Sequence, residues 1–125
     1  LYGGGGHDSL TATGGSGNIL DGGAGNDTIT GSDASDMIRG GSGNDGLTGG
    51  LGADEFIFGT GDGQDVVSDF EDGTDMIRIT SGAADMSGVT ISAQGTDTLV
   101  QFATASILLE NTDASLIDAG DFVFG

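Results

Sequence analysis

The chain has 125 residues, with 27 Gly and 20 acidic residues against two Arg and no Lys, Cys, Pro or Trp, and its formal net charge is −18. With Arg39 and Arg78 as its only Lys or Arg residues, the chain lacks the basic patch that binds nucleic acid or an anionic membrane, and we expect neither partner. The absence of Cys removes disulfides and thiolate metal sites, and no apolar run reaches the roughly 18 residues of a membrane-spanning helix.

A repeat of nine residues opposes the disorder that this composition would otherwise indicate. Four units follow one another without a gap over 22–57: GGAGNDTIT, GSDASDMIR, GGSGNDGLT and GGLGADEFI. Position six is Asp and position eight is a large apolar residue in every unit. Upstream, GGGGHDSLT at 3–11 fits the pattern. TGGSGNILD at 13–21 fits with Asn18 at position six, or it is a shortened unit that starts at Gly14.

The units at both ends of this block are less regular. Leu1 and Tyr2 match positions eight and nine, so we expect the chain to be part of a longer protein. GTGDGQDVV at 59–67 and DFEDGTDMI at 69–77 each end in Gly-x-Asp followed by an apolar pair. The glycine content falls after Gly73, which predicts a boundary near 78–80 between a repeat domain over 1–78 and a C-terminal cap over 79–125.

The segment 79–125 has the pattern of β-structure. VTISAQ at 89–94 and TLVQFA at 98–103 predict two strands around a turn at Gly95, and ASILLE at 105–110 predicts a third. SLIDAGDFVF at 115–124 predicts a turn or short helix followed by a terminal strand. We expect this segment to cap the last repeats.

Each unit divides into a six-residue Gly-rich turn and a three-residue extended piece. Side chains alternate in a strand, so position eight points inward while positions seven and nine point outward. A three-residue strand is stable only if successive units coil into a solenoid, with two units in each full coil. The predicted core is the row of position-eight residues Leu10, Leu20, Ile29, Ile38, Leu47 and Phe56.

Stacking alternate units brings their aspartates together along two edges. The predicted sets are Asp8, Asp27, Asp45 and Asp65 on one edge and Asp36, Asp54 and Asp75 on the other. At a strand spacing of about 4.8 Å, two carboxylates repel by roughly 3 kcal/mol at an effective dielectric constant near 20. A hard dication between the two carboxylates attracts both and turns the net repulsion into net attraction. Carboxylate and carbonyl oxygens favour calcium over magnesium, and zinc would need several His or Cys ligands, whereas this chain has one His and no Cys.

These units resemble the RTX nonapeptide repeat, Gly-Gly-x-Gly-x-Asp-x-apolar-x. The run at 49–79 is similar to the stretch that closes the RTX block in serralysin-type metalloproteases, alginate epimerase R-modules and other type I secretion substrates. The ending SLIDAGDFVF also resembles the C-terminal segment of such proteins. The resemblance implies an all-β fold, a right-handed parallel β-roll.

The resemblance also implies the ligand set. Position six supplies a side-chain oxygen, the carbonyls of positions one and three serve one flanking ion, and those of positions two and four serve the other. GSDASD lacks two glycines, although Asp33 could add a carboxylate, and Asn18 is a neutral ligand at best. About five to seven calcium ions are expected. The implied ligands are Gly3, Gly4, Gly5, Gly6, Asp8, Asn18, Gly22, Gly23, Ala24, Gly25, Asp27, Gly31, Ser32, Asp33, Ala34, Asp36, Gly40, Gly41, Ser42, Gly43, Asp45, Gly49, Gly50, Leu51, Gly52, Asp54, Gly61, Gly63, Asp65, Asp69 and Asp75.

No catalytic constellation remains once the aspartates are assigned to metal. His7 is the only His, and at a variable turn position it is expected to be a surface residue. The Gly-x-Gly-x-x-Gly match at 41–46 precedes no helix and is a fragment of the repeat. Paired carboxylates could serve glycoside hydrolysis, but a carboxylate held by calcium is poorly placed to carry protons. We therefore expect no enzymatic activity.

The sequence thus predicts a calcium-binding RTX module of a larger, secreted, extracellular bacterial protein. In this hypothesis the chain stays unfolded in the cytosol, passes through type I secretion machinery and folds outside on binding calcium. The cap is predicted to bear the secretion signal if Gly125 is near the natural terminus. The alternative is an accessory module that binds polysaccharide, or part of an RTX adhesin, for which Tyr2, Phe70, Arg39 and Arg78 are the available contacts.

Overall fold

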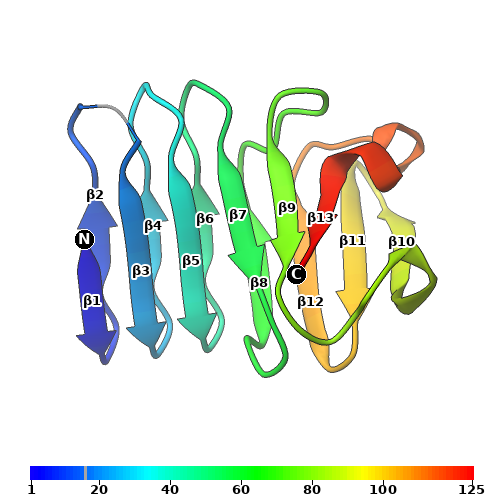
Figure 1. The fold of residues 1–125 in the computed structure, drawn as a ribbon, viewed down its shortest axis with the longest axis horizontal. Helices are drawn as coiled ribbons and strands as arrows, with labels where there is room; N and C mark the ends of the chain where they lie inside the picture. Colours follow the sequence, from blue (N-terminus) through cyan, green and yellow to red (C-terminus); the bar gives the residue numbers. More distant parts are fainter. Residues whose placement is uncertain (16) are drawn as a thin grey trace.

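Stacked coils form the long axis of the molecule in the computed structural model, which describes residues 1–15 and 17–125 (Figure 1). Each coil contributes one strand to each of two facing sheets. The strands are β1 Tyr2–Gly5, β2 Ser9–Thr11, β3 Ile19–Ala24, β4 Thr28–Thr30, β5 Met37–Ser42, β6 Gly46–Thr48, β7 Glu55–Phe58, β8 Gln64–Val67, β9 Met76–Ile79, β10 Val89–Gln94, β11 Asp97–Phe102, β12 Ala105–Leu109 and β13 Phe122–Phe124. Short 3₁₀ turns occupy Met86–Gly88, Ala114–Leu116 and Ala119–Asp121.

Alternate units stack, as the repeat predicts. The first sheet has the order β1-β3-β5-β7-β9-β13, and the second has the order β10-β11-β12-β8-β6-β4-β2. The pairing is parallel throughout the repeats, with Leu20 opposite Ile38 and Ile29 opposite Leu47, 18 residues further along. The predicted all-β fold, a parallel β-roll, is therefore confirmed.

The core lies between the sheets; in the repeats it is built on the position-eight residues, and it continues into the C-terminal segment through residues such as Ile79, Phe102 and Ile107. Leu20, Ile29, Ile38, Leu47 and Phe56 are at most 1% exposed, whereas Leu10, in the first coil, is only half-buried. Burying a large aliphatic side chain contributes about 1.5–3 kcal/mol, so each member of this row adds substantially to the stability of the coils.

The strands of the two sheets differ in length, which the repeat did not predict. The expected three residues are found in β2, β4 and β6, but β3 and β5 have six each. These two strands continue through positions one to three of the next unit, because Gly23 and Ala24 keep their parallel pairing with Gly41 and Ser42. The turns that follow β3 and β5 are correspondingly shorter than predicted.

The C-terminal segment extends both sheets. Its three strands β10 to β12 and terminal strand β13 lie close to where the sequence predicts them. Strand β12 pairs in parallel with β8 and β13 pairs in parallel with β9, while β10 and β11 add antiparallel strands at the end of the second sheet. Within the described residues, no helix has the length and apolar character needed to cross a membrane.

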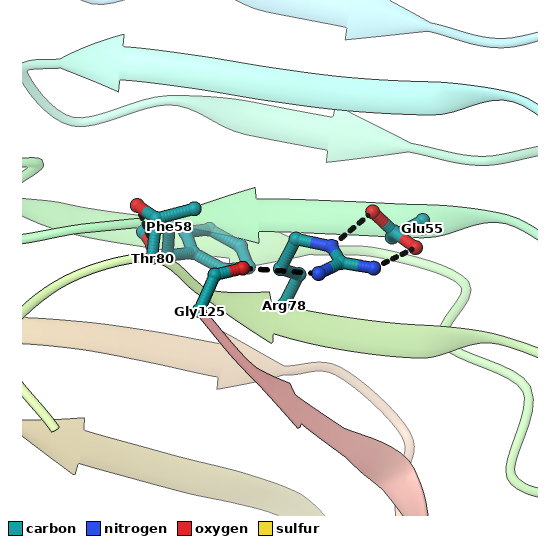
Figure 2. Close-up of polar contacts among 5 residues, drawn as sticks. All are labelled: Glu55, Phe58, Arg78, Thr80 and Gly125. Atoms are coloured by element: carbon teal, nitrogen blue, oxygen red, sulfur yellow. Dashed lines mark hydrogen bonds and ion pairs between the residues drawn. The ribbon is translucent and has the colours of Figure 1, made fainter. Parts of the chain in front are cut away.

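Arg78 ties the repeats to the end of the chain (Figure 2). Its guanidinium donates to both carboxylate oxygens of Glu55 on β7, at 2.6 and 3.3 Å, and to the carbonyl oxygen of Gly125 at 3.0 Å. Beside it, Thr80 donates to the carbonyl of Phe58. The pair with Glu55 is partly exposed, so its contribution to stability is modest, but together with the Gly125 bond it gives each guanidinium nitrogen of Arg78 one partner.

Candidate calcium sites

The turns between the sheets form two rows, at opposite ends of the coils (Figure 1). The first turn row comprises turns 3–8, 22–27, 40–45 and 59–65, which lead from the first sheet to the second. The second turn row comprises turns 13–18, 31–36, 49–54 and 69–75, which lead back. Ser16, within the second predicted unit, lies outside the described residues.

A hydrogen-bond ladder joins the position-six residues of each row, in the registers predicted from the repeat. Each backbone N–H donates to Oδ1 of the position-six residue one coil further along. In the first row Asp8 donates to Asp27, Asp27 to Asp45 and Asp45 to Asp65, at 2.8–2.9 Å; in the second, Asn18 donates to Asp36, Asp36 to Asp54 and Asp54 to Asp75, at 2.9–3.0 Å.

The second oxygen of four of these carboxylates has no partner. Oδ2 of Asp8, Asp27, Asp45 and Asp54 is buried and accepts no hydrogen bond from any described residue. Leaving a buried polar atom unpaired costs about 1–3 kcal/mol, and more for a charged group. Four such atoms in equivalent positions, each on a carboxylate, therefore indicate a cation binding position.

Glycine at position one keeps that position open. A β-carbon added to Gly22 would collide with Oδ2 of Asp27 and lie 2.7 Å from the carbonyl oxygen of Gly40 in the next coil. At Gly3 the added carbon would lie 2.7 Å from both Oδ2 of Asp8 and the Gly22 carbonyl oxygen. The unpaired carboxylate oxygen and a carbonyl oxygen of the next coil thus face the same space.

The other carbonyls alternate in direction along each turn. A β-carbon added to Gly23 or Gly41 would collide with the position-two carbonyl of the preceding coil, so these carbonyls face forward. The position-three carbonyls of Ala24 and Ser42 face backward, where they accept the N–H groups of Gly6 and Gly25 at 2.9 and 2.8 Å. This alternation supports the implied division of carbonyl ligands between two flanking ions. Carboxylates and carbonyls in such numbers suit calcium.

The electrostatics agree with a site built for a cation. Burial, reinforced by the neighbouring carboxylates, raises the pKa of Asp54 to about 6 and that of Asp65 to about 8. Burial likewise raises the pKa of Asp45 and Asp75. Asp36 is the exception: burial alone would raise its pKa, but hydrogen bonds from Ser32 and Asn18 outweigh that effect and lower it.

Two implied ligands are placed differently from the ladder residues. Asp69 accepts the backbone N–H groups of Gly49 and Gly50, at 2.8 Å each, so both its oxygens are engaged by one turn. Asp33 is exposed on turn 31–36. Among the described residues no three His, Cys, Asp or Glu side chains form a metal cluster, so any ion in the turns would draw much of its coordination from the backbone.

A second ladder, at position five, was not predicted from the sequence. Nδ1 of His7 accepts the N–H of Asn26 at 2.9 Å, Oδ1 of Asn26 accepts the N–H of Asn44 at 2.8 Å, and Oδ1 of Asn44 accepts the N–H of Gln64 at 3.0 Å. The recurrence of Asn at position five in two alternate units was the available signal. Asp62, buried in the longer turn 59–65, was also missed.

Comparison with known proteins identifies the repeat. The RTX calcium-binding nonapeptide repeat matches residues 13–47 and 31–67. Curated protein sequences give no significant match. Among solved structures, the AlgE6R2 subunit of the mannuronan C5-epimerase from Azotobacter vinelandii has a TM-score of 0.76 at 24% identity, over 99% of this chain and 91% of that one.

Two further structures share the fold. The AlgE6R3 subunit of the same epimerase has a TM-score of 0.69 at 25% identity, over 93% of this chain and 78% of that one. The extracellular lipase LipA from Serratia marcescens has a TM-score of 0.70 at 26% identity, and the match spans 92% of this chain but 21% of the lipase. Residues 13–67 therefore carry RTX calcium-binding nonapeptide repeats, and the chain stacks them into a parallel β-roll.

Proposed function

We propose that this module is a non-enzymatic part of a larger secreted protein, and that calcium folds it after it has left the cell. The observation that carries the proposal is the set of four buried Oδ2 atoms without a partner, on Asp8, Asp27, Asp45 and Asp54. At low calcium these oxygens and the net charge of −18 oppose folding. When calcium binds only the folded chain, its binding free energy becomes folding free energy.

Secretion follows from the same chemistry. A chain that stays unfolded in the calcium-poor cytosol can be threaded through type I secretion machinery, and extracellular calcium then folds it. RTX repeats, and a likeness to a lipase described as extracellular, of which this chain spans 21%, support the proposal of a larger secreted protein. In this proposal the residues after the boundary near 78–80 form a cap, and they contain the secretion signal if Gly125 is near the natural terminus.

Circular dichroism during a calcium titration tests the proposal. In chelator at neutral pH the chain should give a disordered spectrum, and calcium should produce a β spectrum in one cooperative transition. Magnesium at the same concentration should not, because it prefers a tighter octahedral shell and retains water. A cooperative thermal transition that is the same in chelator and in calcium would overturn the proposal.

The absence of enzymatic activity is part of the proposal. The single His, His7, faces the Asn26 backbone through Nδ1 and serves the position-five ladder. In the first turn row, the carboxylates of Asp27, Asp45 and Asp65 each accept a hydrogen bond from a backbone N–H of the preceding coil. This arrangement favours metal binding over proton transfer.

A second candidate function is the binding of an acidic polysaccharide, in an accessory module or an RTX adhesin. The observation that favours it is a groove of about 610 Å³ on the outer face of the first sheet, where Tyr2, Asp21 and Arg39 lie on neighbouring strands. Tyr2 is 71% exposed, and the guanidinium of Arg39 forms no ion pair with any described residue. An aromatic ring and a free guanidinium suit a sugar ring and a carboxylate.

Retention on immobilised mannuronan, the polymer named for the similar epimerase subunits, tests this second function. In calcium the intact chain should be retained, and Arg39→Gln should abolish retention without changing the circular dichroism spectrum. Lack of retention of the intact chain in calcium, or equal retention of Arg39→Gln, would contradict it.

A further inference from the structure

Asn18 makes the junction between turns 13–18 and 31–36 unlike the others. Its side-chain Nδ2 donates to Oδ1 of Asp36 at 2.8 Å, to Oγ of Ser32 at 3.1 Å and to the carbonyl oxygen of Gly14 at 3.2 Å. These three oxygens come from both turns of the pair. The amide group has two hydrogens, so the three contacts share them.

The carboxylate of Asp36, which this amide contacts, is fully hydrogen-bonded. Oδ1 of Asp36 accepts both the backbone N–H and the side chain of Asn18, and Oδ2 accepts the backbone N–H of Ser32 at 2.6 Å and its hydroxyl at 3.1 Å. Neither oxygen of Asp36 is a buried atom without a partner, in contrast to Oδ2 of Asp8, Asp27, Asp45 and Asp54. The turn is therefore satisfied by protein donors.

The substitution at position six explains the difference. In the other stacked pairs the position-six residue of the earlier turn presents a carboxylate oxygen to the space between the coils, as Asp27 does toward the carbonyl of Gly40. At residue 18 that side chain presents N–H donors, which have the polarity of a cation and need oxygen partners. Turning the amide over would offer calcium one neutral oxygen and would remove a hydrogen bond from the Asp36 carboxylate.

We infer that the Asn18 side-chain amide takes the place of a calcium ion between turns 13–18 and 31–36, so that this junction is held together without metal. By the criterion of an unpaired Oδ2 the first row then has three stacked pairs suited to calcium, and in the second row Asp54 marks one, between turns 49–54 and 69–75. The inference rests on the proposed calcium binding of the other turns. The lowered pKa of Asp36 agrees with it, since Ser32 and Asn18 donate to its charged form.

Restoring the consensus carboxylate tests the inference. Asn18→Asp replaces the donor by an oxygen that faces the same carbonyl and Asp36, and at saturating calcium it should raise the number of ions per chain by one. Native mass spectrometry counts the ions directly, and calorimetric titration gives the stoichiometry in solution. Asn26→Asp is the matched control, because it makes the same chemical change at position five and keeps the acceptor for the Asn44 N–H; its ion count should equal that of the unmodified chain.

The outcomes separate this inference from the proposed function. If the unmodified chain binds no calcium, the proposed function fails. If it binds calcium and folded Asn18→Asp binds no additional ion, the inference alone is overturned. Should Asn18→Asp not fold, Asn18→Ala decides: an unchanged ion count supports the amide in place of calcium, and the loss of one ion shows that Asn18 was a ligand.

Discussion

The backbone N–H of Asp27 donates to Oδ1 of Asp45, 18 residues further along the chain, at 2.8 Å. Oδ2 of the same Asp45 is buried and has no hydrogen-bond partner among the described residues. One carboxylate thus joins two coils with its first oxygen and faces a cation position with its second. The two oxygens of this side chain therefore have different roles, one in stacking the coils and one in binding the cation.

Asp45→Asn should weaken calcium binding strongly. The substitution leaves an oxygen that can accept the Asp27 N–H, but it removes the charge and can place an N–H donor where Oδ2 lies. Loss of an interaction with a charged group corresponds to about 1.5–3 kcal/mol, or roughly ten- to a hundredfold in affinity. A fluorescence or dichroism titration gives the calcium midpoint. The exposed Glu110→Gln makes the same change in charge, and equal midpoints for the two variants would contradict the assignment.

Gly41→Ala should destabilise the calcium-bound roll. Gly41 has a φ of 97°, and an added β-carbon would collide with the Gly23 carbonyl oxygen of the preceding coil. The backbone conformation alone costs about 1–3 kcal/mol for a residue other than glycine, and the collision adds to it. Thermal unfolding in saturating calcium should show a Tm lower by several degrees. Gly46→Ala, where an added β-carbon meets no atom within 4 Å, should unfold at nearly the original temperature; a comparable loss there would refute the argument from close approach.

The calcium-free chain should become more structured as the pH falls from 8 toward 5. Burial raises the pKa of Asp54 to about 6 and of Asp65 to about 8 in the folded state, above the ordinary value of about 4. The folded state therefore binds more protons than the unfolded state, and the stability that protonation contributes is lost as the pH rises through these values. Dichroism in chelator at pH 5 and pH 8 measures the effect. More structure at pH 8 would show that the sign is wrong.

Calcium binding should have the opposite pH dependence. The ligands must be deprotonated to bind the ion, so protons compete with calcium at Asp54 and Asp65. The calcium concentration at the folding midpoint should decrease as the pH is raised from 5.5 to 8. An unchanged midpoint over this range would mean that the raised pKa values do not belong to calcium ligands.

Asn44→Ala should loosen the first turn row without removing a metal ligand. The Asn44 side chain accepts the Gln64 N–H at 3.0 Å, and the loss of such a hydrogen bond costs about 0.5–1.5 kcal/mol. Chemical unfolding in calcium measures this loss. Asn44→Asp keeps an acceptor oxygen and should restore most of the stability, whereas equal losses in both variants would rule out the position-five ladder as its source.

The nonapeptide pattern was sufficient to predict the coils, the core row and the two aspartate ladders. Each of these depends on one residue type recurring at a fixed interval, such as Ile38 above Leu20 or Asp45 above Asp27, so a local pattern determines a contact 18 residues away. The six-residue length of β3 and β5 could not be read in this way. The additional residues of these strands are mainly glycines. Glycine pairs through its backbone and has no side chain whose pattern would predict a strand.

Contacts outside the repeat were beyond the pattern. Strand β12 places Leu109 opposite Val67, and β13 places Phe124 opposite Ile79. No repeating pattern in the sequence links the residues of these pairs. The role of Asn18 was likewise hidden, because its neutral side chain reads as a weak ligand until Gly14, Ser32 and Asp36 are seen around its amide nitrogen. In both cases the contacts depend on how the chain folds and are not encoded in a repeating pattern.

Backbone amide exchange tests most directly whether calcium holds the coils together. The N–H groups of Asp27, Asp36, Asp45 and Asp54 each donate to the carboxylate one coil further along, so their exchange with solvent deuterium reports the stacking itself. At neutral pH these four amides should be strongly protected in saturating calcium and should exchange at the rate of an unfolded chain in chelator. Equal protection of all four in chelator and in calcium would contradict the account.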